Sequence, residues 1–149
     1  MYAGIVFDGQ LFVLDSFLHV TASFVLLCLI SSAIYIINDM VDIESDRQHP
    51  KKRKRAIASG QFPIPAARVA AVVLVALSLG GALLISPWLA VVLLAYLLLH
   101  LLYSWRLKHI VILDLLSVAA GFVLRVLAGV VVVQVQAFSP WLYACTALL

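Results

Sequence analysis

The stretch Val69–Trp105, VAAVVLVALSLGGALLISPWLAVVLLAYLLLHLLYSW, contains no Asp, Glu, Lys or Arg. A helix that crosses a bilayer needs about 20 mostly apolar residues, so this stretch is long enough for two such helices. Ser86-Pro87 divides it, because a proline cannot continue the helix that precedes it. We therefore expect two consecutive spans, over about 66–85 and 88–103, joined by a tight uncharged turn.

The rest of the chain has the same apolar character. Of its 149 residues 65% are hydrophobic and 11% are charged, and the mean hydropathy is +1.15. A soluble domain is about half apolar and about a quarter charged, and a chain this short cannot cover so much apolar surface with its own core. Further spans are expected over about 15–37 and 111–132, and a fifth begins near Ser139-Pro140. The prediction is an all-α, polytopic transmembrane bundle of four to five spans, forming a single transmembrane domain over 1–149.

Charge is concentrated in the predicted loop 39–65. Six of the ten Lys and Arg residues lie within 47–55. Because short basic loops stay in the cytoplasm, this loop and the smaller basic segment at 104–110 are predicted to be cytoplasmic. The net charge of +3 therefore describes one loop, and no folded basic face is available for nucleic acid.

The acidic half of this loop has a regular spacing. In NDMVDIESD, Asn38–Asp46, the residues Asp39, Asp42 and Asp46 stand at i, i+3 and i+7, which on a helix places them within about 60° of one another. Carboxylates this close repel each other, and a divalent cation removes that penalty; Mg²⁺ prefers such oxygens together with a diphosphate. The basic run that follows would hold phosphate oxygens. The alternative is a solvated turn whose charges set topology or bind anionic lipid.

A second polar pattern lies inside an apolar span. Asp114 and Arg125 are costly within a membrane and are expected to face a polar interior. Eleven residues separate them, so they lie on one stripe with Ser117 and Gly121 but about 16 Å apart. They are too distant to pair, which predicts separate partners in a lined cavity; an ion pair or a helix-packing groove is the alternative. His100, in the preceding span, is expected to be packed and hydrogen-bonded.

These motifs resemble a known family. NDMVDIESD is similar to the first aspartate-rich motif, NDxxDxxxD, of the UbiA superfamily of intramembrane prenyltransferases. RQHPKKRKRAIASG, Arg47–Gly60, resembles the HPxKRxRPIASG continuation of its decaprenyl-phosphate phosphoribosyltransferase branch, with Ala56 in place of the usual proline. The segment Tyr103–Gly129 resembles that branch between its fourth and fifth helices. The resemblance covers nearly the whole chain but about half of the family fold.

The resemblance implies a bundle of about nine spans around a cavity that opens to the cytoplasm, in a plasma membrane of bacterial type. It implies Mg²⁺ at Asp39, Asp42 and Asp46. It also implies transfer of 5-phosphoribosyl from 5-phosphoribosyl 1-diphosphate to polyprenyl (decaprenyl) phosphate, for cell wall biosynthesis. The substrate-binding residues that it implies are Asn38, Lys51, Arg53, Arg55, Tyr103, Lys108, Asp114 and Arg125.

The extent of the resemblance predicts a fragment, and two alternative functions stay open. The family's first helix is absent or reduced here, and its second aspartate-rich motif is expected beyond Leu149, so the 149-residue chain alone is predicted to be an inactive fragment. A UbiA-type prenyltransferase with a prenyl diphosphate donor and an aromatic acceptor is the nearest alternative. A non-catalytic membrane module that binds anionic lipid is an alternative of another class. Homo-oligomers are compatible with all three.

Overall fold

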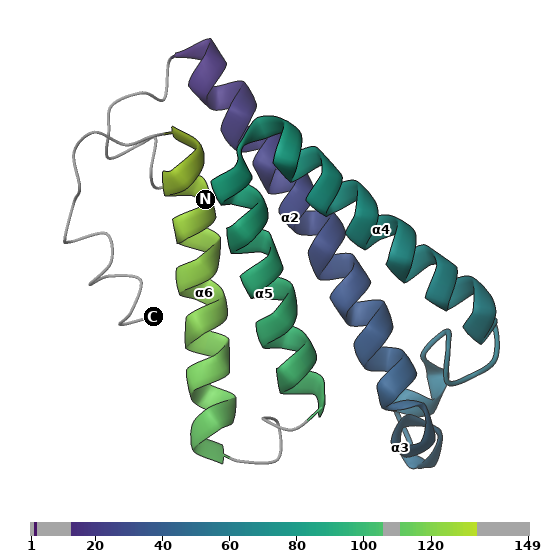
Figure 1. The fold of residues 1–149 in the computed structure, drawn as a ribbon. Coiled ribbons are helices and arrows are strands. Elements are labelled where there is room, and N and C mark those ends of the chain that lie inside the picture. The colour runs from purple at the N-terminus through teal and green to yellow at the C-terminus, as the bar shows by residue number, and fades with distance from the viewer. Residues whose placement is uncertain (1, 3–12, 106–110, 134–149) are drawn as a thin grey trace.

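The computed structural model describes residues 2, 13–105 and 111–133, and all the regular secondary structure within them is helical. Four long helices are joined up and down: α2 (Leu14–Val41), α4 (Ile64–Ile85), α5 (Pro87–Trp105) and α6 (Val111–Val133). Figure 1 shows α2 between α4 and α5, with α6 beyond α5. All four are long and apolar enough to cross a membrane, which confirms the predicted all-α transmembrane class. The expected fifth span and Lys108 lie outside the described residues.

The segment between α2 and α4 differs from the predicted loop. α2 continues to Val41, so Asn38 and Asp39 belong to its last turns. The backbone then departs from helical geometry at Asp42 (φ −91°, ψ 6°), and the short helices α3 (Ile43–Gln48) and η1 (Lys52–Lys54) follow. The spacing of the three aspartates alone predicts one continuous helix. The structure instead divides them between α2, the break at Asp42 and α3.

Small side chains allow α2 and α4 to pack closely. The buried face of α4 consists of Ala67, Ala71, Ser78 and Ala82. Ser78 Oγ donates to the backbone oxygen of Leu26 on α2 at 2.8 Å. In a bilayer, close backbone approach and interhelical hydrogen bonds hold helices together, because lipid is as apolar as the side chains. This side of α2 is consequently a dry interface.

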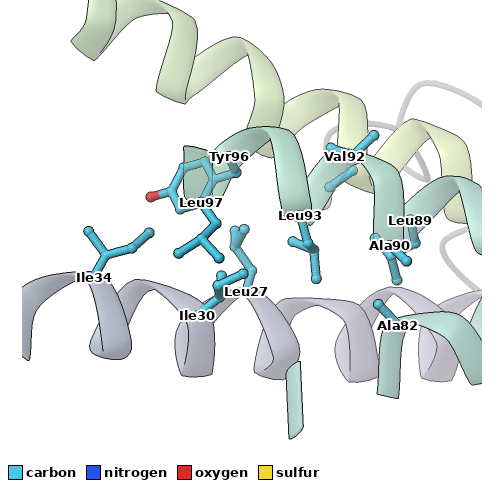
Figure 2. Close-up of a cluster of buried hydrophobic side chains, with 11 residues drawn as sticks. Leu27, Ile30, Ile34, Ala82, Leu89, Ala90, Val92, Leu93, Tyr96 and Leu97 are labelled. Atoms are coloured by element: carbon cyan, nitrogen blue, oxygen red, sulfur yellow. The ribbon is translucent and has the colours of Figure 1, made fainter. Parts of the chain in front are cut away.

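An apolar cluster joins α2 to α5 on the other side (Figure 2). Ile30 and Leu93 are fully buried in it, and Ala82 of α4 and Ala128 of α6 complete it. Tyr96 is only 2% exposed, and its hydroxyl points out of the cluster at the end occupied by Ile34. The Tyr96 hydroxyl of α5 therefore lies beside the interior of the bundle.

Candidate functional site

At the loop end of the bundle, one arginine joins two of the three predicted metal-binding aspartates. Arg55 Nη1 lies 2.9 Å from Asp39 Oδ1 and 2.8 Å from Asp46 Oδ2. The Asp46 side chain is 2% exposed, whereas those of Asp39 and Arg55 are 31% and 38% exposed. We call these three residues the charged cap. The sequence pattern predicts that a divalent cation offsets the repulsion between these carboxylates. In the structure, the Arg55 guanidinium does so for Asp39 and Asp46.

The loop that carries Arg55 is fixed by its own hydrogen bonds. His49 Nδ1 accepts from the backbone N–H groups of Lys51 and Lys52 at 3.2 and 3.3 Å. Further along, Arg47 Nε donates to the backbone oxygen of Ala58 at 3.3 Å. Gly60 has a φ of +81°, a conformation that favours glycine, and it turns the chain toward α4. The loop thus folds back onto the end of α2 and presents Arg55 to the acidic motif.

A cavity of about 170 Å³ lies among α2, α5 and α6. This volume has room for several waters or one small polyatomic anion. We call it the intramembrane cavity. Its polar lining comes from Ser31, Tyr35, Asn38, Tyr96, His100, Tyr103, Ser104, Ser117 and Arg125.

The loop end of the cavity contains the other half of the acidic motif. Ser104 Oγ donates to Asn38 Oδ1 at 2.9 Å. Tyr103 lines the same end of the cavity. The motif is therefore divided: Asp39 and Asp46 contact Arg55, whereas Asn38 contacts Ser104 of α5.

The structure does not bring the three predicted carboxylates together at one point, and their binding of Mg²⁺ stays a prediction. Within the described ranges, no three His, Cys, Asp or Glu side chains are gathered closely enough to hold a metal ion. The physical reasons are the backbone break at Asp42 and the guanidinium between Asp39 and Asp46. The donors still suit Mg²⁺ chemically, because all of them are carboxylate or amide oxygens.

The inner end of the cavity is formed around Arg125. Its Nη2 and Nε donate to the Tyr96 hydroxyl at 2.7 and 3.3 Å, and Ser31 Oγ lies 3.4 Å from the same oxygen. The guanidinium carbon is 5.5 Å from the ring centroids of Tyr96 and Phe122. Within the described ranges Arg125 thus does not pair with Asp114, as a separation of about 16 Å requires.

His100 differs from its expected hydrogen-bonded state. Its Nε2 is buried and has no hydrogen-bond partner in the described part of the chain. The ring fits against α6 because position 121 is glycine: a Cβ there would lie 3.2 Å from His100 Nε2. Tyr96, Ser31 and Ser104 also line the cavity, although no sequence motif pointed to them. A tyrosine in the middle of an apolar span was the available signal, since a buried Tyr hydroxyl usually has a partner.

The remaining predicted residues are exposed or undescribed. Lys51 and Arg53 are exposed on the outer side of the loop. Neither of them takes part in an ion pair within the described ranges.

Several known proteins are similar in sequence to this chain. The chain is 40% identical over 122 residues to a decaprenyl-phosphate phosphoribosyltransferase of Mycobacterium tuberculosis. The aligned region covers 82% of this chain and 40% of that protein. It is 41% identical over 126 residues to the enzyme of the same name from Corynebacterium glutamicum, covering 83% of this chain and 38% of that protein. An uncharacterized protein, y4nM, of Sinorhizobium fredii is 44% identical over 127 residues, covering 85% of this chain and 24% of its own length.

The chain thus spans about two fifths or less of the length of these curated relatives. The profile of the UbiA prenyltransferase family matches residues 2–149, which is nearly the whole sequence. With its four candidate membrane spans, the protein is an integral membrane protein. On this match, the chain belongs to the UbiA prenyltransferase family.

Proposed function

We propose that the protein is a Mg²⁺-dependent intramembrane transferase that moves 5-phosphoribosyl from 5-phosphoribosyl 1-diphosphate to a polyprenyl phosphate such as decaprenyl phosphate. The observation that carries the proposal is the basic loop that folds back onto the acidic motif, with Arg55 in contact with Asp39 and Asp46. A donor with many anionic oxygens needs such adjacent cations, and two relatives of about 40% identity are named for this reaction.

The acidic motif would hold the metal. Asp39, Asp42 and Asp46 would bind Mg²⁺ with the help of Asn38, and the ion would neutralise charge on the departing diphosphate. For this to happen, Arg55 must leave the two carboxylates that it contacts. A donor diphosphate offers the guanidinium replacement oxygens, so metal and donor binding would exchange its partners.

The basic residues would then hold the donor. Lys51 and Arg53 are exposed on the loop and are able to reach phosphate oxygens from the aqueous side. Tyr103 would contact phosphate at the mouth of the intramembrane cavity. Lys108 would also contact phosphate, and Asp114 would take part in binding the substrate. The basic loops would face the cytoplasm, where a soluble donor arrives.

In the proposed reaction, an oxygen of the lipid phosphate attacks the anomeric carbon of the ribose. The bond from that carbon to the diphosphate oxygen breaks, and diphosphate leaves with the electron pair. The product is a lipid-linked phosphoribose, which would serve cell wall biosynthesis as an activated pentose.

Binding measurements on the purified protein in lipid nanodiscs test this function. We expect Mg²⁺-dependent binding of 5-phosphoribosyl 1-diphosphate in preference to a prenyl diphosphate, weakened at least about tenfold in Asp42→Asn. Glu44→Gln is the matched control, because Glu44 is exposed and pairs with Arg47 at 3.7 Å. Preference for the prenyl diphosphate would favour the prenyltransferase alternative. Binding of neither donor would favour the non-catalytic lipid-binding module.

A further inference from the structure

We propose that the intramembrane cavity is a binding site for a phosphate monoester, held by Arg125 beside Tyr96. The inference rests on the proposed function and adds to it a second anion site, separate from the charged cap. Three observations carry it: a guanidinium without an anionic partner, a rigid support for that guanidinium, and an open volume beside the predicted donor site.

The first observation is the charge of Arg125. Arg125 lies well inside α6, and the described residues place no carboxylate within 4.0 Å of its guanidinium. Two of its nitrogens donate to one neutral oxygen, that of Tyr96, although a guanidinium carries five N–H donors. An uncompensated charge within a membrane is costly. A bound anion would remove that cost and use the remaining donors.

The second observation is how firmly the guanidinium is held. Its acceptor Tyr96 is 2% exposed and packed in the apolar cluster, so the hydroxyl has a fixed position. The two flanking rings, of Tyr96 and Phe122, lie 5.5 Å from the guanidinium carbon. A planar fork held in this way is preorganised for two parallel bonds to a phosphate. Flexible snorkelling to the membrane surface would need none of these contacts.

The third observation is the space beside the guanidinium. The cavity of about 170 Å³ is lined by Arg125 together with Tyr96 and His100. His100 Nε2 is buried next to Gly121 of α6, so this nitrogen is not open to the cavity. The cavity therefore offers one cation, that of Arg125, to a small anion.

The location fits the substrates of the proposed reaction. Ser31, beside Tyr96, is seven residues from Asn38 on α2, so the two ends of the cavity are about 10 Å apart. Both proposed substrates contain a phosphate monoester: the 5-phosphate of the donor and the head group of the lipid acceptor. A donor whose diphosphate lies at the acidic motif would extend its 5-phosphate inward, whereas a lipid phosphate would enter from the bilayer.

The test measures binding of each substrate separately, with Mg²⁺, to the purified protein in nanodiscs. The ligands are 5-phosphoribosyl 1-diphosphate and a short-chain polyprenyl phosphate, and the variants are Arg125→Gln and Arg125→Lys. Arg68→Gln is the matched control, since Arg68 is an exposed arginine of α4 outside the cavity. We expect Arg125→Gln to raise the Kd of one ligand at least about tenfold and to leave the other within about twofold, with Arg125→Lys intermediate.

The affected ligand identifies the source of the phosphate. Unchanged Kd values for both ligands in Arg125→Gln would overturn the site while leaving the proposed function intact. Equal weakening of both, with a lower thermal unfolding midpoint, would overturn it as well, because it indicates a structural role. Where Arg125→Gln does not fold, Tyr96→Phe keeps the charge and is expected to weaken the same single ligand about threefold. A wild-type protein that binds neither ligand would overturn the proposed function together with the site.

Discussion

Two arginines show how differently the two ends of the site are prepared for anions. Arg55, in the charged cap, contacts two carboxylates at 2.8 and 2.9 Å. Arg125, in the intramembrane cavity, donates to the neutral hydroxyl of Tyr96, and the described residues supply it with no carboxylate. Among the described residues, the first cation is neutralised by carboxylates and the second is not.

This difference predicts two kinds of binding. At the charged cap, a metal or a phosphate has to replace an existing ion pair, so the net gain is the difference between old and new contacts. In the cavity, an anion would add contacts that the fold lacks, and it would remove the cost of an isolated charge. Variants in the two regions should therefore differ in which property they change.

The largest expected effect on stability is in the charged cap. Asp46 is 2% exposed at its side chain and Asp39 is 31% exposed, although both contact Arg55. We expect Asp46→Ala to lower the free energy of unfolding by about 2 kcal/mol, less than a fully buried pair would lose because Arg55 keeps Asp39. Asp39→Ala should cost about 0.5 kcal/mol. Chemical unfolding in detergent measures both, and an equal cost would show that burial does not decide the strength of this pair.

The next effect concerns the cavity. Tyr96→Phe removes the acceptor of two Arg125 hydrogen bonds without changing the packed ring. We expect the free energy of unfolding to fall by about 1.5 kcal/mol, because the bond involves a charged donor. Tyr35→Phe is the control, since Tyr35 lines the same cavity but is 71% exposed. If Tyr96→Phe lowers the free energy of unfolding no more than Tyr35→Phe does, the hydrogen bonds from Arg125 to Tyr96 do not contribute to stability.

The sequence was sufficient to predict the four described spans, because hydropathy and span length are local properties. It was also sufficient to exclude a direct contact between Asp114 and Arg125, because helix geometry alone forbids it. The pairing of Arg55 was not predictable, since it depends on the path of the loop after α3. The spacing of the aspartates also gives no sign of the break at Asp42. Tyr96 was missed because an isolated tyrosine in an apolar span does not reveal which neighbour its hydroxyl meets.

Arg55 itself provides a test with opposite signs. If its guanidinium competes with metal for Asp39 and Asp46, Arg55→Gln should lower the Kd for Mg²⁺ alone by about threefold. The same variant should raise the Kd for the donor diphosphate by a similar factor, because a phosphate contact is lost. Lys54→Gln is the control: it removes the same charge from an exposed position of η1. Two changes of the same sign would contradict the exchange of partners.

The smallest expected effect lies where the two regions meet. Ser104 is 4% exposed, and its hydroxyl bonds Asn38 Oδ1 at 2.9 Å, joining α5 to the acidic motif. Ser104→Ala should lower the free energy of unfolding by about 0.6 kcal/mol, the average for such bonds between membrane helices. Ser32→Ala is the control, because that exposed hydroxyl bonds only its own helix, at Cys28 O. If Asn38 assists the metal, Ser104→Ala should also weaken Mg²⁺ binding about twofold, whereas Ser32→Ala should leave it unchanged. A stability loss without any change in Mg²⁺ affinity would assign Asn38 to helix packing and leave the metal to the aspartates.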